Sequence, residues 1–132
     1  MTNETPESLQ EHSQRFLEMA FRTDKCGIPT SPHGHGKRTG QCGDTIEMFV
    51  TVLDNHIESV RYQCEGCINT RACGCTVACM AEGKSIERAW EITPETIVNY
   101  LETLPGEEAH CAELAVGAFY LALNNLQKAV GS

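Results

Sequence analysis

Residues 43–67 read GDTIEMFVTVLDNHIESVRYQCEGC, and this stretch decides the fold class. Apolar and polar side chains alternate from Ile46 to Val52, which is the pattern of a strand with one buried face. A second β-rich run covers residues 57–64, and the turn-forming residues DNH stand before it. A connection this short favours an antiparallel hairpin, so we expect the stretch to form two paired strands.

Helical patterns fill the chain after this hairpin. Small and apolar residues recur at helical spacing over residues 68–82, and Gly83 is a stop signal. Three further helices are expected, at residues 85–90, from Thr93 to Leu101 and from Glu107 onward. Strands followed by a run of helices, without βαβ alternation, predict an α+β fold, in which helices pack on one face of a small antiparallel sheet of about three strands.

The chain before the hairpin divides into a helix and a loop. Residues 1–21 contain apolar residues at helical spacing after Pro6, and they predict an amino-terminal helix. Residues 22–41 contain two prolines and four glycines, which predict a flexible loop. His33 and His35 lie on this loop, where two ligands alone would bind a metal weakly, so we interpret them as solvated side chains.

Length and charge bound the function. A chain of 132 residues, of which 41% are hydrophobic, is long enough for one domain with its own core, and residues 42–130 carry the expected sheet, helices and metal site. The net charge of -8, with only 10 Lys and Arg, argues against nucleic acid as a partner. The sequence shows neither a secretion signal nor a membrane span, and we expect a cytoplasmic protein.

Eight cysteines are the conspicuous feature of the composition, at positions 26, 42, 64, 67, 73, 75, 79 and 111. In a reducing cytoplasm such cysteines serve packing, redox chemistry or metal binding rather than disulfides. The apolar face of the helix over residues 68–82 carries Cys75 and Cys79, which we expect to be packed in the core. Cys64 belongs to a CxxC motif and Cys73 to a CxC motif, and the role of each is open. The role of Cys26 is open as well.

The remaining cysteines stand at positions suited to chemistry. Cys42 and Asp44 are two residues apart at the start of a strand and can face one ion, although a plain turn explains them as well. Cys67 precedes a helix, whose amino terminus lowers the pKa of a thiol, and the same applies to Cys111. His110 and Cys111 diverge by about 100° on a helix, so we interpret them as alternative ligands.

Three segments together resemble the iron-sulfur scaffold family of IscU and the amino-terminal domain of NifU: GQCGDTIEMFVTVLDNHIESVRYQCEGC, AEGKS and LPGEEAHCAELA. The resemblance implies a scaffold rather than an enzyme, with the same α+β fold. It further implies that Cys42, Cys67 and Cys111 hold the cluster, that Asp44 keeps the cluster labile, and that His110 is an auxiliary ligand.

The resemblance also implies partners and a cargo. Family members receive persulfide sulfur from a pyridoxal-phosphate cysteine desulfurase, for which Cys67 or Cys111 is the candidate acceptor, and they pass a transient cluster, here expected to be of the 2Fe-2S type, to apo-proteins. Members served by an Hsp70-type chaperone carry LPPVK where this chain has LPGEE, so chaperone recognition is not expected. The sequence does not decide whether the site lies within one chain or is shared between the two chains of a homodimer.

Two alternatives use the same cysteines. Three thiols with Asp44 or His110 also make an acceptable zinc site, so the chain is alternatively a zinc-bound sulfur acceptor that stimulates a desulfurase. In a third interpretation the cysteines are packed or sense oxidants, and the chain is a structural or redox-responsive binding module.

Overall fold

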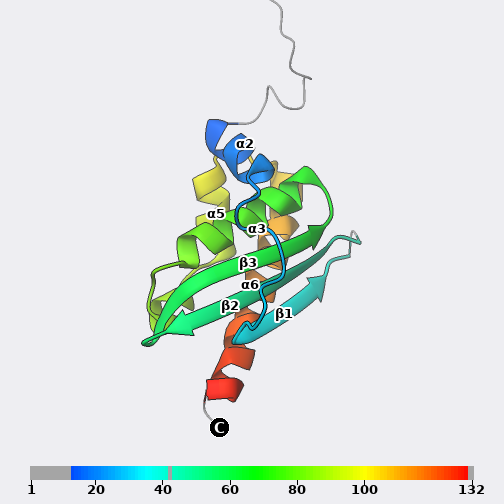
Figure 1. The fold of residues 1–132 in the computed structure, drawn as a ribbon. Helices are drawn as coiled ribbons and strands as arrows, with labels where there is room; N and C mark the ends of the chain where they lie inside the picture. Colours follow the sequence, from blue (N-terminus) through cyan, green and yellow to red (C-terminus); the bar gives the residue numbers. More distant parts are fainter. Residues whose placement is uncertain (1–12, 42, 131–132) are drawn as a thin grey trace, which may run out of the picture.

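The computed structural model describes residues 13–41 and 43–130, apart from the side chains of Glu107 and residues 127–130. One sheet and a group of helices make up these residues (Figure 1). In chain order the elements are α2 (Gln14–Phe21), β1 (Gly34–Thr39), β2 (Thr45–Leu53), β3 (His56–Glu65), α3 (Ile68–Ala81), α4 (Ile86–Ala89), α5 (Pro94–Leu101), the 3-10 helix η1 (Gly106–Glu108) and α6 (Ala109–Val130).

The sheet has the strand order β1-β2-β3, and both pairs are antiparallel. The predicted hairpin is confirmed: β2 and β3 pair from Thr45 opposite Glu65 to Leu53 opposite His56. In the turn between them, Asp54 and Asn55 adopt positive φ angles of 53° and 64°, which Asp and Asn tolerate better than most residues do. The α+β prediction, with a three-stranded antiparallel sheet, is therefore confirmed.

Strand β1 corrects one prediction, because it lies inside the segment 22–41 that was expected to be a flexible loop. The glycines that predicted a loop serve packing instead. A Cβ atom on Gly34 would overlap the carbonyl oxygen of Ala122, and one on Gly36 would overlap that of Ala118, so α6 lies directly on the backbone of β1. The strand depends on a helix that lies far away in the sequence.

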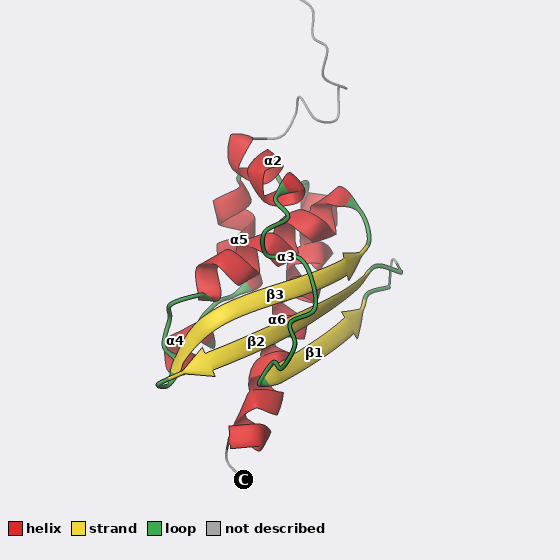
Figure 2. Cartoon of the chain, viewed as in Figure 1, coloured by secondary structure: helices red, strands yellow, loops and turns green. Residues whose placement is uncertain are grey.

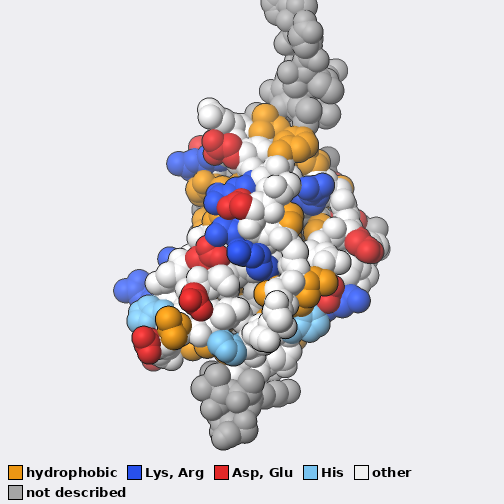
Figure 3. All heavy atoms as spheres, in the orientation of Figure 1, with side chains coloured by type: hydrophobic (Ala, Val, Ile, Leu, Met, Phe, Trp, Pro, Cys, Tyr) orange, Lys and Arg blue, Asp and Glu red, His pale blue; other side chains and the backbone are white. Residues whose placement is uncertain are grey.

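Helices cover one face of the sheet, as Figure 2 shows, and the segment between α2 and β1 crosses the opposite face. That segment hydrogen-bonds to β3 through Gly27 N–H and Tyr62 C=O at 3.0 Å, and to β2 through His33 N–H and Val50 C=O at 2.8 Å. Basic and acidic side chains are interspersed on this face, the arrangement of an ordinary solvated surface (Figure 3). The core therefore lies between the sheet and helices α3 and α6.

The predicted helices are found close to their expected bounds. Helix α4 is capped by Ser85 and α5 by Thr93, whose side chains accept backbone N–H groups. The amino-terminal helix is described from Gln14 to Phe21, and the earlier part of that prediction lies outside the described residues. Among the helices that the structure describes, none has the length and apolar character needed to cross a membrane.

Candidate metal centre

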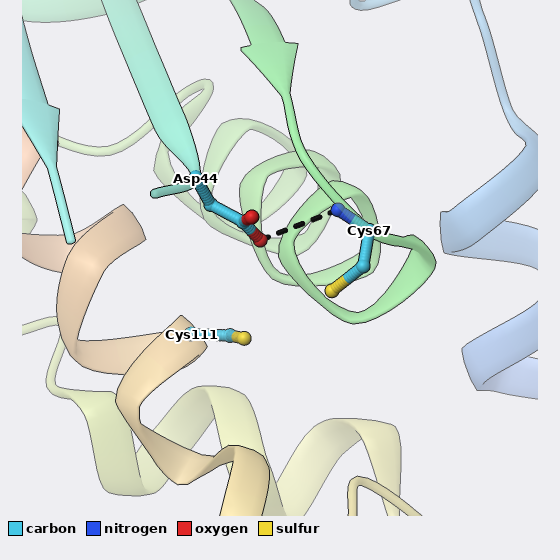
Figure 4. Close-up of side chains that lie close together, drawn as sticks. All are labelled: Asp44, Cys67 and Cys111. Atoms are coloured by element: carbon cyan, nitrogen blue, oxygen red, sulfur yellow. Dashed lines mark hydrogen bonds between the residues drawn. The ribbon is translucent and has the colours of Figure 1, made fainter. Parts of the chain in front are cut away.

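The start of β2 and the amino-terminal ends of α3 and α6 meet at one edge of the molecule, and each contributes a possible ligand. Asp44 lies just before β2, Cys67 is the N-cap residue of α3, and Cys111 lies in the first turn of α6. One ligand atom from each residue lies within 4.8 Å of the other two. Their side chains point toward a common space (Figure 4), and we call these three residues the Asp44 group.

Asp44 holds the amino terminus of α3. Its Oδ2 atom accepts the backbone N–H of Cys67 at 3.2 Å and the hydroxyl of Thr70 at 2.6 Å. Cys67 makes no side-chain capping hydrogen bond of its own, and Asp44 instead accepts the N–H of this N-cap residue together with the Thr70 hydroxyl, which ties the first turn of α3 to the start of β2. Gly66 makes the approach possible, because a Cβ atom there would lie 2.6 Å from Asp44 Cγ.

Thr70 lies among the three members of the Asp44 group. Its side chain is fully buried, and Oγ1 lies 3.3 Å from Cys111 Sγ and 3.8 Å from Cys67 Sγ. The hydroxyl has one proton, and the short contact with Asp44 indicates that this carboxylate receives it. Sequence reasoning missed Thr70, although its place one helical turn after Cys67 was the available signal.

The two thiols of this group differ in access to solvent. Cys67 is exposed, whereas Cys111 is 0% exposed. Burial raises the pKa of Cys111 to about 12, while the contact with the Thr70 side chain lowers it and the nearby Cys67 and Glu108 groups raise it. The prediction that the helix amino terminus lowers this pKa is therefore wrong, because burial dominates. A metal ion would have to displace the Cys111 proton.

The side chains of His110 and Cys111 were expected to point in different directions, but their ligand atoms lie close together. The imidazole is long enough to place Nε2 3.7 Å from Cys111 Sγ, even though the two residues are neighbours on the helix. Glu108 Oε1 lies 3.5 Å from Cys111 Sγ and 3.8 Å from His110 Nε2. Glu108, His110 and Cys111 thus form a second set of possible ligands, which we call the Glu108 group. In the sequence, Glu108 is the last residue of the segment LPGEE, which was compared with LPPVK but was not predicted to hold a metal.

Cys42 lies outside the described residues, so its predicted place beside Asp44 stays a prediction. A cavity of about 730 Å³ lies next to this part of the chain and beside His110. Its lining residues are Arg38, Thr39, Gly40, Gln41, His110, Glu113 and Leu114. Of the residues in the two ligand groups, His110 is the one that lines this cavity.

The cysteines of α3 are not members of either ligand group, although burial raises the pKa of Cys73 and it lies close enough to Cys111 and Cys67 for their charges to raise this pKa further. Cys75 is buried, as expected for a packing residue, and so is Cys73. Cys79 is only partly buried, and a hydrogen bond with Cys75 lowers its pKa to about 7. Burial raises the pKa of Cys64 to about 11, while Cys26 is exposed opposite Tyr62 of β3.

The two histidines of the expected loop have structural partners. His33 Nδ1 accepts the backbone N–H of Val52 at 2.9 Å. His35 lies on β1, stacks on the ring of Phe49 at 4.9 Å and places Nε2 2.8 Å from a carboxylate oxygen of Glu47. Among the described residues, neither histidine is a member of a group of possible metal ligands.

The donor types suit iron and its clusters as well as zinc. Thiolates are soft ligands that bind clusters and zinc, whereas carboxylate and imidazole complete such sites with weaker, more exchangeable bonds. Both ligand groups combine a thiol with a carboxylate, and both are reached by the sulfur of Cys111. The arrangement can bind a soft or borderline metal ion or cluster and release it.

Comparisons with known proteins agree with this chemistry. The model of the family described as "NifU-like N terminal domain" matches residues 30–131. The iron-sulfur cluster assembly scaffold protein IscU 1 of Archaeoglobus fulgidus is 37% identical over 82 residues, which are 62% of this chain and 54% of that protein. The scaffold protein IscU of Aquifex aeolicus is 25% identical over 118 residues, 87% of this chain and 75% of the relative. The chain thus spans about half the length of the Archaeoglobus relative.

Solved structures show the same fold. The amino-terminal NifU-like protein of Brucella abortus superposes with a TM-score of 0.72 at 16% identity, covering 88% of this chain and 94% of that one. The FiSufU protein of Fervidobacterium islandicum gives a TM-score of 0.73 at 16% identity, with 88% and 98% of the two chains covered. At such identities the likeness concerns the fold alone.

Proposed function

The chain belongs to the family of NifU-like amino-terminal domains, and on this premise we propose that it is a scaffold on which iron-sulfur clusters are assembled and from which they are released. The observation that carries the proposal is the convergence of the Asp44 group, whose ligand atoms lie within 4.8 Å of one another at the open edge of the fold. We propose no catalytic residue, because a scaffold holds its cargo rather than turning over a substrate.

The cluster ligands in this proposal are Cys42, Cys67 and Cys111, with Asp44 and His110 as exchangeable ligands. The proximity of Asp44, Cys67 and Cys111 supports the assignment, and the softness of thiolates toward cluster iron supports it further. A carboxylate is a poorer match for cluster iron, so Asp44 provides a bond that breaks readily. A 2Fe-2S cluster is the cargo that we propose.

Cys67 is the sulfur acceptor that we favour over Cys111. A persulfide on a desulfurase can reach the exposed Cys67, whereas Cys111 is buried and its pKa is raised. In the transfer, the Cys67 thiolate attacks the terminal sulfur of the desulfurase persulfide. A new S–S bond forms on Cys67, the old S–S bond breaks, and the desulfurase cysteine leaves as a thiolate.

The partners in this proposal are a pyridoxal-phosphate cysteine desulfurase, which supplies sulfur, and apo-proteins that receive the cluster. The described cysteines are free thiols, and a site built from thiols needs a compartment that keeps them reduced. This supports the cytoplasmic location that composition predicts.

Anaerobic reconstitution tests the proposal. The protein is incubated with iron(II), cysteine, a desulfurase and a dithiol reductant that reduces persulfide sulfur to sulfide, and cluster formation is followed by visible absorption and Mössbauer spectroscopy. We expect a cluster in the wild type and a loss of most of it in Cys67→Ser, while Cys26→Ser, which changes an exposed thiol outside both ligand groups, retains it. A colourless wild type, or equal yields in the two variants, would overturn the assignment.

A zinc-bound sulfur acceptor is the second candidate function. The compact Glu108 group favours it, since its nitrogen, oxygen and sulfur donors are those of protein zinc sites. This function requires that the zinc-loaded protein accelerates a desulfurase without transferring any cluster. Parallel assays of sulfide release and of cluster transfer to an apo-ferredoxin separate the two candidates.

A further inference from the structure

Arg38 stands on the face of β1 that is turned toward α6. Alternate residues of a strand share a face, so Arg38 follows Gly34 and Gly36 along the same side of β1. A Cβ atom on either glycine would overlap the backbone of α6. The next position on this face nevertheless carries a full arginine side chain, which needs space between the strand and the helix.

Gly117 of α6 provides that space. A Cβ atom on Gly117 would lie 2.0 Å from Arg38 Nη1 and 3.0 Å from Arg38 Cζ, so the guanidinium rests directly on the helix backbone. Glycine weakens a helix relative to alanine, and the seat for Arg38 is a physical reason for its presence inside α6. The contact fixes where the positive charge of Arg38 lies.

A negative charge lies near this seat. Arg38 and Glu113 both line the cavity of about 730 Å³ beside α6. Glu113 precedes Gly117 by four residues, so the two positions are one helical turn apart on the same side of α6. Among the ion pairs of the described residues, none includes Arg38 or Glu113. A cation and an anion therefore line one cavity without pairing with each other.

This pair of charges suits a zwitterion. A guanidinium binds a carboxylate through two parallel hydrogen bonds, and a carboxylate accepts hydrogen bonds from an ammonium group. An anion without a positive charge would be attracted by Arg38 but repelled by Glu113, and a simple cation would meet the reverse. The cavity also has a volume within the range of about 300–1,000 Å³ in which proteins bind small molecules.

We propose that Arg38 and Glu113 form a binding site for a small zwitterion, in which Arg38 holds a carboxylate and Glu113 holds an ammonium group. Free amino acids and short peptides carry this pair of charges. Neither Arg38 nor Glu113 belongs to the Asp44 group or the Glu108 group, so binding requires no metal.

A titration of the metal-free full chain, followed by nuclear magnetic resonance, tests the site. The probes are L-alanine and the dipeptide L-alanyl-L-alanine, which carry the same two charges at different separations. We expect saturable binding of at least one probe, with amide shift changes at Thr39, Gly40 and Leu114. The better probe is then compared with its N-acetyl and amide forms, which keep one charge each and should bind at least about fivefold more weakly.

Matched variants identify the two charges. We expect Arg38→Gln to weaken binding at least about tenfold and Glu113→Gln at least about fivefold. Lys37→Gln removes the same charge as Arg38→Gln, but from the opposite face of β1, and it should leave the affinity within about twofold of the wild type. Circular dichroism checks that each variant is folded.

Gly117→Ala separates the position of the guanidinium from its charge. The added methyl group meets the flexible end of Arg38 rather than the protein backbone, and alanine is the better helix former. We expect this variant to be at least as stable as the wild type in urea, and to bind the better probe at least about threefold more weakly because the guanidinium has moved.

Three results would overturn the site. They are a lack of saturable binding for both probes, equal losses in Lys37→Gln and Arg38→Gln, and tighter binding in Glu113→Gln. The last result would show that Glu113 repels an anion instead of holding an ammonium group. Because the titration contains neither iron nor sulfide, a failure here leaves the scaffold function untouched, and a failure to form clusters leaves this site standing.

Discussion

At the scale of single residues, Asp44 has two roles. It is a candidate ligand, and it also accepts the Cys67 N–H and the Thr70 hydroxyl at the start of α3. A substitution at Asp44 therefore changes both metal binding and the stability of α3. Unfolding of the metal-free protein measures the change in stability alone.

We expect Asp44→Ala to lower the free energy of unfolding of the metal-free protein by about 1–2 kcal/mol, because α3 loses its cap and the buried Thr70 hydroxyl loses its acceptor. Urea unfolding measures this change. Asp24→Ala is the control, since Asp24 pairs with Arg22 on the exposed surface, where an ion pair contributes little to stability. Equal losses in the two variants would contradict the capping role.

Cys79 should be the most reactive thiol of α3 near neutral pH. The hydrogen bond with Cys75 lowers its pKa to about 7, so its alkylation rate by iodoacetamide should rise as pH passes through this value. Cys75→Ala removes the hydrogen bond, and we expect alkylation of Cys79 at neutral pH to slow by about tenfold. Peptide mass spectrometry follows the rate.

Cys64 provides the internal comparison for this measurement, because burial raises its pKa to about 11 and its alkylation should be slow until the solution is strongly alkaline. An unchanged rate at Cys79 in Cys75→Ala would show that the hydrogen bond does not activate this thiol.

At the scale of elements, the contact between β1 and α6 depends on two glycines. A Cβ atom on Gly36 would overlap the backbone of α6 at Ala118, so we expect Gly36→Ala to destabilise the protein by about 1–3 kcal/mol. Gly106→Ala is the matched control, because a Cβ atom there meets nothing within 4 Å. Urea unfolding of both variants tests the contact, and a Gly36→Ala protein as stable as the control would refute it.

The elements also show what sequence could predict. Strands β2 and β3 and the helices from α3 to α6 follow from local periodicity and caps, because one face of each packs on the core. Strand β1 was missed because Gly34 and Gly36 carry no periodic apolar signal; their role depends on a helix that begins at Ala109.

For the candidate site too, the sequence predicted local features but not the contacts between distant segments. The positions of Cys67 and Cys111 at helix starts could be read from the chain, and the structure brings Asp44 to them. Thr70 lies one helical turn after Cys67, but its contact with Cys111 exists only once α3 and α6 have packed together. Glu108 lies three residues before Cys111, so its contact is local and its position in the sequence was the available signal.

At the scale of the whole molecule, buried thiols make folding sensitive to alkaline pH. Burial raises the pKa of Cys73 as well as those of Cys64 and Cys111, to about 11 and about 12 for the latter two. Above about pH 9 the unfolded chain binds fewer protons than the folded one, so stability falls as pH rises, by up to about 1.4 kcal/mol per pH unit for each such thiol.

We therefore expect the free energy of unfolding of the metal-free protein to be lower at about pH 10 than at about pH 8. Urea unfolding at the two values measures the difference. Cys73→Ala removes one buried thiol and should reduce it. A difference that is absent in the wild type, or unchanged in the variant, would contradict this source of pH dependence.

The fold as a whole brings helix starts and a strand start to one open edge, with the stable core behind them. The ligand on α3, Cys67, is exposed, and His110 on α6 lines a cavity, so a cargo can be held by rigid elements and still be reached from solvent. This is the arrangement that a protein needs if it builds a cluster and then gives it away.

Cluster transfer tests that claim most directly. The reconstituted protein is mixed anaerobically with an apo-ferredoxin, and circular dichroism in the visible region follows the cluster as it changes its protein environment. We expect the ferredoxin to fill faster than it does with equal amounts of free iron and sulfide, and the scaffold to lose its signal at the same rate. A cluster that stays on this protein, or a ferredoxin that fills no faster than from free ions, would contradict the scaffold function.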